Sequence, residues 1–239
     1  MQSLSNEKQV KTAAILVGGK GTRLQPLISH VPKPLAPVGD EPFLFLLIRA
    51  LLKVGYQNIV LLTGYRHEAI VEACQSDNAP KANFYYSREL TPLGTAGALK
   101  QAQKYLSSCA EFLLLNGDTY LDDFVTLART PLKDNFGLMG VIKPKENDRY
   151  GSVLFDAESK RILSFQEKNP LVQCYVNAGI YKFSPAILAE IPPHQFCSLE
   201  NDILPLLISQ HRSLCALPLH GQFYDIGLPE SYLQFVEAH

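Results

Sequence analysis

The feature that most constrains the fold of this chain is an alternation of short apolar runs with segments of helical periodicity through its first half. Most of these runs place apolar residues at consecutive positions, which is typical of strands buried on both faces of a sheet. Alternation of such strands with helices predicts a parallel sheet covered by helices on both faces. The expected strands are 12–17, 58–63, 82–86 and 111–116, and the expected helices are 43–54, 66–75 and 95–106.

The second half is strand-like with few helices, which predicts an antiparallel or mixed extension of the sheet. No internal repeat and no linker rich in Gly, Ser or Pro divides the chain, and 239 residues suffice for one large domain. We therefore expect one α/β domain over residues 1–239. It should combine a doubly wound, Rossmann-like, mostly parallel lobe at about 1–135 with a smaller mixed or antiparallel lobe at about 136–239. The expected later strands are 136–143, 151–155, 162–167, 174–183 and 214–217, and the expected later helices are 200–210 and 229–238.

Composition argues against several classes of partner and compartment. The chain carries 22 Lys and Arg against 23 Asp and Glu, a balance that speaks against nucleic acid or a membrane surface as partner. Its five cysteines are scattered without a CxxC pair, which favours a reducing compartment over a disulfide framework or zinc site. The polar start MQSLSNEKQV is unlike a signal peptide, and Arg49 and Lys53 interrupt the most apolar segment. We expect a cytoplasmic protein, and the sequence leaves open whether it forms a homodimer.

The segment ILVGGKGTRLQPLISHVPKPL, residues 15–35, joins an apolar run to glycines and cations. Ligands of doubly wound sheets bind beyond the carboxyl ends of the strands, where Gly18, Gly19 and Gly21 would let backbone N–H groups approach phosphate oxygens. Arg23 can hold a phosphate with its forked guanidinium, and Lys33, between two prolines, supplies a compact charge. The spacing matches neither a P-loop nor GxGxxG. The pattern therefore favours a phosphate site over a plain tight turn.

Two aspartates follow apolar runs in a similar way. Asp118 ends the run in EFLLLNGDTYL, and Asp225 follows an aromatic pair in FYDIGLPESY. Two carboxylates near a phosphate site are the ordinary means of holding Mg²⁺, which prefers oxygen ligands and the phosphates of a substrate. Either aspartate alone could instead be a turn or cap residue. In combination with the glycine segment they predict a magnesium site.

Taken together, seven sequence blocks resemble the signature blocks of the sugar-1-phosphate nucleotidylyltransferases. In chain order they are VGGKGTRLQPL…VPKPL, PLGTAGAL, NGDTYL, YGSV, FQEKNP, NAGIY and YDIGLPESY, and they span nearly the whole chain. The resemblance implies the nucleotide-diphospho-sugar transferase fold and transfer of a nucleotidyl group from a nucleoside triphosphate to a sugar 1-phosphate. It also implies that Arg23 and Lys33 neutralise the triphosphate while Asp118 and Asp225 bind Mg²⁺, with no covalent intermediate on the enzyme.

The same resemblance assigns residues to the nucleotide. Glu89 would lie beside the base, where its carboxylate could accept from both N1–H and N2–H₂ of guanine, whereas uracil and thymine offer one donor on that edge. Glu89 therefore favours GTP over UTP or dTTP, with a solvated loop glutamate as the alternative. The other residues expected against the nucleotide are Leu16, Gly18, Gly19, Gly21, Thr22, Gly94 and Thr95.

On the acceptor side, the resemblance implies that Glu167 accepts from sugar hydroxyls and that Lys168 pairs with the phosphate of the sugar. Each of these residues could also be an ordinary residue at a strand end. The full expected set is Tyr150, Gly151, Glu167, Lys168, Asn177 and Gly179.

Three shorter blocks, GYRHE, PLGTAG and FCSLENDILP, resemble the guanylyltransferase branch that acts on D-glycero-D-manno-heptose 1-phosphate, with mannose-1-phosphate guanylyltransferases as near relatives. The leading hypothesis is a Mg²⁺-dependent guanylyltransferase that makes a GDP-sugar for glycan assembly. A uridylyl- or thymidylyltransferase acting on a hexose 1-phosphate is the second hypothesis, and a non-catalytic sensing subunit is the third.

We interpret His67 with Glu68, and Ser198 with Glu200 and Asp202, as residues at helix starts. Tyr224 stands where many relatives have tryptophan.

Overall fold

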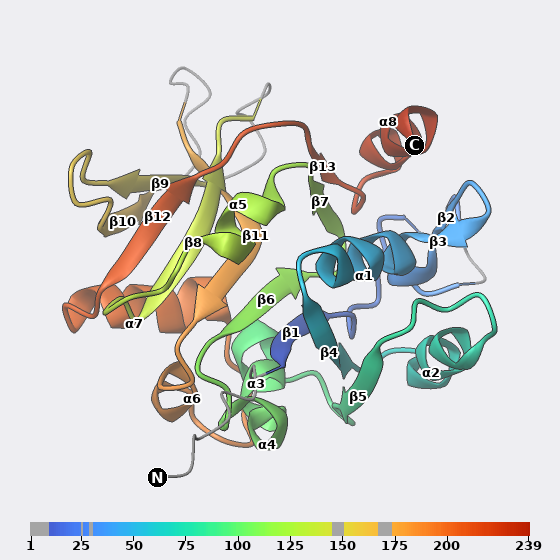
Figure 1. Cartoon of the computed structure of the whole chain (residues 1–239), viewed down its shortest axis with the longest axis horizontal. Coiled ribbons are helices and arrows are strands. Elements are labelled where there is room, and N and C mark those ends of the chain that lie inside the picture. The colour runs from blue at the N-terminus through green and yellow to red at the C-terminus, as the bar shows by residue number, and fades with distance from the viewer. Residues whose placement is uncertain (1–9, 25, 29–30, 145–150, 167–173) are drawn as a thin grey trace, which may run out of the picture.

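The computed structural model describes residues 10–24, 26–28, 31–144, 151–166 and 174–239. Its centre is a nine-stranded mixed sheet in the order β10-β9-β11-β6-β1-β4-β5, with β8 beside β11 and β12 beside β8 (Figure 1). These strands are β1 (Lys11–Leu16), β4 (Tyr56–Thr63), β5 (Asn83–Arg88), β6 (Phe112–Asn116), β8 (Gly137–Ile142), β9 (Ser152–Phe155), β10 (Ile162–Gln166), β11 (Val176–Phe183) and β12 (Leu214–Pro218).

The strands from the first half are parallel, as their alternation with helices predicts. β1 pairs with β4 and β6, and β4 pairs with β5, all in parallel register. The mixed half begins at β11, which runs antiparallel to β6, β8 and β9, and β12 adds a parallel edge to β8. The expected α/β sheet with a mixed extension is therefore confirmed.

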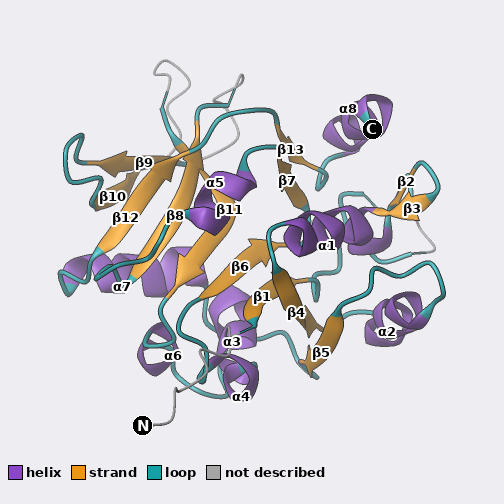
Figure 2. Ribbon diagram, in the orientation of Figure 1, coloured by secondary structure: helices purple, strands orange, loops and turns teal. Residues whose placement is uncertain are grey.

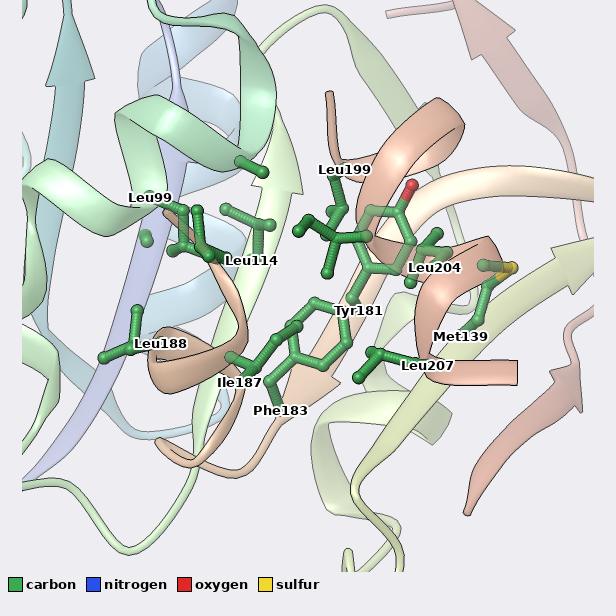
Figure 3. Packing of buried hydrophobic residues seen from close by; sticks show 14 of the residues in the cluster. Leu99, Leu114, Met139, Tyr181, Phe183, Ile187, Leu188, Leu199, Leu204 and Leu207 are labelled. Carbon is green, nitrogen blue, oxygen red and sulfur yellow. The ribbon is translucent and has the colours of Figure 1, made fainter. Parts of the chain in front are cut away.

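Helices cover both faces because successive side chains of the buried strands point to opposite sides. In β6, Phe112 and Leu114 belong to one hydrophobic cluster, and Leu113 and Leu115 belong to another. The two layers can be followed in Figure 2, and Figure 3 shows Tyr181 and Phe183 of β11 packed inside the first cluster. The first face carries α3 (Gly94–Gln101), α4 (Gln103–Leu106), α6 (Ile187–Glu190) and α7 (Leu204–Ser209), and the second carries α1 (Phe43–Lys53), α2 (His67–Gln75) and α5 (Phe124–Arg129). No helix in the described part of the chain has the length and apolar character needed to cross a bilayer.

A third hydrophobic cluster attaches the C-terminal helix α8 (Pro229–Ala238) to the start of α1. Phe235 packs edge-on against Phe43 with ring centroids 5.2 Å apart, and the hydroxyl of Tyr232 donates to the carbonyl of Pro37 at 2.6 Å. Just before α8, β13 (Phe223–Asp225) pairs antiparallel with β7 (Thr119–Leu121). Because β7 directly follows β6, this pairing places the C-terminal segment of the chain beside the carboxyl end of β6.

The main differences from expectation concern interrupted helices and very short elements. The helix expected at 95–106 is divided into α3 and α4, and the one expected at 200–210 opens with a π-helical turn, η2 (Leu199–Ile203), before α7. The elements that sequence reasoning missed contain two to six residues, too few for a period to emerge. They are η1 (Lys33–Leu35), β2 (Pro37–Val38), β3 (Glu41–Pro42), β7, α5, α6 and β13.

A bulge interrupts β11 at the point where it passes the end of β6. Asn177 lies opposite Val141 of β8, and Tyr181 lies opposite Met139. Between these two pairs β11 therefore advances by four residues while β8 advances by two. Gly179, inside this bulge, has φ +69°, a conformation that favours glycine. A Cβ there would also lie 2.6 Å from the Asn116 side chain. Bulges re-aim side chains and are common next to functional sites.

Lys182 provides a test of how the two halves of the sheet are held together. Its side chain is 1% exposed, and its ammonium group donates to the carbonyls of Ala128 and Thr130 and pairs with Glu111 at 3.0 Å. Replacement by Met leaves the two carbonyls and the Glu111 carboxylate without their donor. Lys182→Met should therefore lower the free energy of unfolding by about 2–4 kcal/mol. Urea denaturation measures the loss. Lys81→Met, at an exposed lysine, should change it by less than about 0.5 kcal/mol, and equal stability of the two variants would refute the assignment.

Candidate functional site

A cavity of about 660 Å³ opens beyond the carboxyl ends of β1, β4 and β6, the position where doubly wound sheets bind ligands. Of the residues expected against a nucleotide, Leu16, Gly18, Gly19, Glu89, Gly94 and Thr95 line it, and so does Asp118. Sequence reasoning gave no site role to several other residues of the wall. These are Lys20, Leu62, Gly64, Tyr65, Arg88, Leu90, Thr91, Pro92, Ala98, Asn116, Gly117 and Phe196.

The Glu89 side chain lies across the ends of β1 and β4. A Cβ on Gly64 would come within 2.7 Å of its Oε1 atom, and one on Gly18 within 3.0 Å. The glycines therefore create the space that the carboxylate occupies. Glu89 Oε2 accepts a hydrogen bond from the backbone N–H of Leu93 at 2.9 Å. Burial raises the pKa of Glu89, and the Leu93 hydrogen bond opposes that shift in part.

A cluster of opposite charges borders the cavity at the end of β6. The ammonium group of Lys33 contacts Asp118 Oδ2 at 2.6 Å, and the side chains of Lys33 and Asp118 are 14% and 38% exposed. Asp225 lies opposite Thr119 in the β7–β13 pair, and the N–H of Ile226 donates to the Asp118 carbonyl at 2.9 Å. The short β-ladder thus brings the two aspartates, distant in sequence, to the same place.

The two aspartates suit a cation that takes its other ligands from water and from the substrate. Within the described residues, no group of three or more His, Cys, Asp or Glu side chains could hold a metal ion by itself. Asp118 and Asp225 would supply two oxygens, with Asp225 Oδ1 also accepting from the N–H of Gly227 at 2.8 Å. Mg²⁺ is usually bound in this way, through one or two carboxylates with waters and substrate phosphates.

The remaining expected residues are not among those that line the cavity, or they lie outside the described part. Gly21 packs against the Lys33 side chain, and Thr22 and Arg23 are exposed in the turn that follows. Gly151 is exposed and immediately precedes β9, and Asn177 Oδ1 accepts from the N–H of Gly179 in the β11 bulge. Tyr150, Glu167 and Lys168 lie outside the described residues, so their roles stay predictions.

The residues interpreted as helix starts divide into two groups. Ser198 Oγ accepts from the N–H of Asn201, and Asp202 accepts from the N–H of Ser198 at 2.7 Å, so both cap the π-helical turn. The Glu200 carboxylate contacts Thr95 and Tyr181, and it also accepts from the hydroxyl of the capping Ser198 at 3.3 Å. His67 is the first residue of α2, and its ring bonds to Thr63 at 2.8 Å.

Four other side chains belong to the sequence interpretation or to the cavity rim. Glu68, in the first turn of α2, pairs with Arg88 at 2.8 Å. Tyr224 packs edge-on against Phe235 of α8. At the rim, Leu90 and Phe196 are 88% and 69% exposed. Phe196 enters from a distant segment, and no local sequence signal marks it.

Comparison with known proteins places this geometry in context. Residues 12–239 match the family model described as Nucleotidyl transferase. Mannose-1-phosphate guanyltransferase beta-B of Xenopus laevis is 38% identical over 228 residues, which are 92% of this chain and 62% of that protein, so the chain spans less than two thirds of its length. D-glycero-alpha-D-manno-heptose 1-phosphate guanylyltransferase of Campylobacter jejuni is 34% identical, covering 94% of this chain and 98% of that one. The crystal structure of HddC from Yersinia pseudotuberculosis superposes with a TM-score of 0.84 at 31% identity, covering 95% and 99% of the two chains, and HddC has also been solved complexed with GMP-PN.

The contact between Gly64 and Glu89 can be tested by adding one methyl group. Gly64→Ala should push the carboxylate off its position and lower the free energy of unfolding by about 1–3 kcal/mol through overpacking, measured by urea denaturation. Gly19→Ala is the matched control, since a Cβ there meets nothing within 4 Å. Combining Gly64→Ala with Glu89→Ala should relieve part of the loss. A Gly64→Ala protein as stable as Gly19→Ala would contradict the described packing.

Proposed function

This chain belongs to the nucleotidyl transferase family, and we propose that it transfers a guanylyl group from GTP to D-glycero-D-manno-heptose 1-phosphate, releasing pyrophosphate. One observation carries the proposal. A single cavity is lined by the half-buried carboxylate of Glu89 and by Asp118, and Asp118 belongs to a charged cluster with Lys33 and Asp225. The two curated relatives described above are both named guanylyltransferases, and HddC was solved with a guanine nucleotide analogue.

Glu89 is the proposed reader of the base. Its carboxylate offers two oxygens at the cavity wall, and among the described residues the one hydrogen bond to it, from the N–H of Leu93, leaves lone pairs on both oxygens. Guanine presents N1–H and N2–H₂ as adjacent donors, and a site built to accept both discriminates against a base that offers one. The exposed side chains of Leu90 and Phe196 border the same cavity and would contact the apolar faces of the nucleoside.

The proposed transfer is an in-line displacement at the α-phosphorus of GTP. An oxygen of the sugar phosphate forms the new P–O bond, and the bond to the bridging β-phosphate oxygen breaks as pyrophosphate leaves with its electron pair. Lys33, and Arg23 from the neighbouring turn, would stabilise the charge that builds on the phosphate oxygens. Lys20 lines the cavity within the glycine loop and would add a third cation. Positioning and charge stabilisation then supply the catalysis.

Asp118 and Asp225 would hold Mg²⁺. The ion, when bound, would neutralise phosphate charge and orient the triphosphate. Asp118 already holds the Lys33 ammonium group in place. This contact keeps a cation beside the position of the phosphates and limits repulsion between the two carboxylates.

The proposed acceptor side combines Tyr150, Gly151, Glu167, Lys168, Asn177 and Gly179. In this proposal residues of about 1–135 bind the nucleotide, and residues of about 136–239 bind the sugar phosphate. Almost all the residues that line the cavity belong to the first group, with Phe196 as the exception, which supports that division. A cytoplasmic location is proposed on the cysteine pattern and on the supply of GTP there.

A second acceptor, mannose 1-phosphate, is favoured by the higher identity of the Xenopus relative. Pyrophosphate release should therefore be measured with GTP, UTP, dTTP, CTP and ATP crossed with heptose, mannose and glucose 1-phosphates. Turnover with GTP and the heptose phosphate alone supports the proposal, and turnover with mannose 1-phosphate supports the second candidate. Turnover with UTP or dTTP would refute the role of Glu89, and nucleotide binding without turnover would indicate a non-catalytic subunit.

Glu89→Gln should lower the preference for GTP over UTP by about 10- to 100-fold, because one acceptor becomes a donor that faces a guanine donor. The ratio of kcat/KM for the two nucleotides measures it. Wild-type GTP use should also fall as pH decreases through the raised pKa of Glu89, since protonation removes the acceptor. This pH dependence should be absent in Glu89→Gln. An unchanged preference for GTP in the variant would exclude Glu89 from base recognition.

Asp225→Asn should raise the Mg²⁺ concentration needed for half-maximal turnover by about tenfold or more, because a neutral amide is a weaker ligand than a carboxylate. Asp122→Asn is the control. Asp122 accepts from the N–H of Gln222 next to the same β7–β13 pair, and this variant should keep the wild-type requirement. Identical magnesium titrations of Asp225→Asn and wild type would remove Asp225 from the metal site.

A further inference from the structure

Resting on the proposed function, we infer that Glu200 is a positioning residue that fixes the nucleotide side of the site against the acceptor side. The sequence FCSLENDILP places Glu200 between two capping residues, and the structure assigns it a different task. Ser198 and Asp202 together satisfy the start of the π-helical turn η2, so the turn does not need Glu200 as a cap. The carboxylate accepts from the Ser198 hydroxyl of its own turn at 3.3 Å, and it also reaches two elements from opposite halves of the chain.

One arm of this contact holds the first turn of α3. The hydroxyl of Thr95 donates to Glu200 Oε2 at 2.8 Å and accepts from the N–H of Leu199 at 2.7 Å. The N–H groups of Ala96 and Gly97 donate to the carbonyl of Cys197 at 3.0 and 3.1 Å. The segment that carries Glu200 therefore takes up donors that a helix start leaves free. Thr95 itself lines the cavity, so this arm sets a wall of the nucleotide site.

The other arm reaches the bulge of β11. Tyr181 donates from its hydroxyl to Glu200 Oε1 at 3.2 Å, and the amide of Asn177 donates to the same hydroxyl. Asn177 Oδ1 in turn accepts from the N–H of Gly179 at 2.9 Å. Burial, and then the Glu200 carboxylate, raise the pKa of Tyr181 well above its usual value, so the hydroxyl stays a donor. Figure 3 shows this hydroxyl directed toward the turn that carries Leu199.

The bulge is placed where it can transmit a shift to the reaction centre. Gly179 packs against the side chains of Asn116 and Thr119, which flank Asp118 in sequence. Among the described residues, Asn116 Oδ1 and Thr119 Oγ1 are the buried side-chain atoms without a hydrogen-bond partner. Few polar contacts therefore fix this junction, and its geometry depends on the bulge. Glu200 and Tyr181 are not among the residues that line the cavity, so they act through the residues they hold.

The chemistry of the contact requires a carboxylate. Thr95 and Tyr181 each present a hydroxyl hydrogen to Glu200, and each hydroxyl oxygen already accepts from another group. A glutamine at position 200 could accept from one hydroxyl, and its amide would face the other. Either the buried Tyr181 hydroxyl or the partly buried Thr95 hydroxyl would lose its acceptor, which disturbs one arm whichever way the amide turns.

The test compares steady-state kinetics of Glu200→Gln, Tyr181→Phe and wild type. Glu200→Gln should raise KM for both GTP and the sugar 1-phosphate by about 3- to 30-fold. Tyr181→Phe removes only the hydroxyl of the β11 arm and should raise KM for the sugar phosphate alone. In the double variant Glu200→Gln/Tyr181→Phe, the KM for the sugar phosphate should exceed the wild-type value by less than the product of the two single fold-changes. The reason is that both changes break the same connection. Equilibrium binding of a non-hydrolysable GTP analogue checks the nucleotide arm directly.

Asp202→Asn is the matched control in the same turn. It weakens the cap and should lower Tm while leaving both KM values unchanged. A Glu200→Gln enzyme with a lower Tm and wild-type KM values would overturn the inference, as would fully independent effects in the double variant. If Glu200→Gln does not fold, Tyr181→Phe decides, since an unchanged KM for the sugar phosphate refutes the β11 arm. Absence of pyrophosphate release by wild type would instead refute the proposed function, and the inference with it.

Discussion

The antiparallel pairing of β11 with β6 is the contact on which the rest of the structure depends. β6 closes the parallel half of the sheet, whereas β8, β9 and β12 join through β11. β6 and β9 share one edge of β11, since Val176 and Tyr181 both have β8 on the other edge. Where β6 ends, this edge of β11 pairs with β9 instead, and the bulge at Gly179 lies where the pairing partner changes. The site lies there because the parallel strands end there.

The charged groups at this edge are arranged so that each is stabilised by a neighbour. Lys33 pairs with Asp118, and Asp225 accepts from the backbone N–H of Gly227. These neighbours offset part of the desolvation cost of each charge. The same arrangement keeps cations and carboxylates within reach of a polyphosphate. The stability of the free protein and the proposed chemistry therefore use the same side chains.

A hydrogen-bond network of the buried Tyr181 and the partly buried Thr95 and Glu200 extends this principle beyond the charged groups. Glu200 links α3 to β11 through Thr95 and Tyr181, and the chain of hydrogen bonds ends at Gly179. Such a network specifies one arrangement, because each member loses a partner if another moves. Helix α3 and the bulge are thus held together by polar contacts as well as by the hydrophobic cluster around Tyr181.

The sequence by itself determined the parallel half of the sheet, its mixed extension and the family, which the match over residues 12–239 confirmed. It could do so because strand and helix periods, and motifs such as GGKGTR, are local properties of the chain. It also indicated part of the cavity wall, since Gly18, Glu89 and Thr95 lie in or beside those motifs. Only the tertiary structure decided that Phe196 enters the cavity and that Glu200 bonds to α3 and β11 as well as to Ser198 of its own turn. These contacts join residues far apart in the chain, and their partners are set by how the sheet and helices pack, which no local pattern encodes.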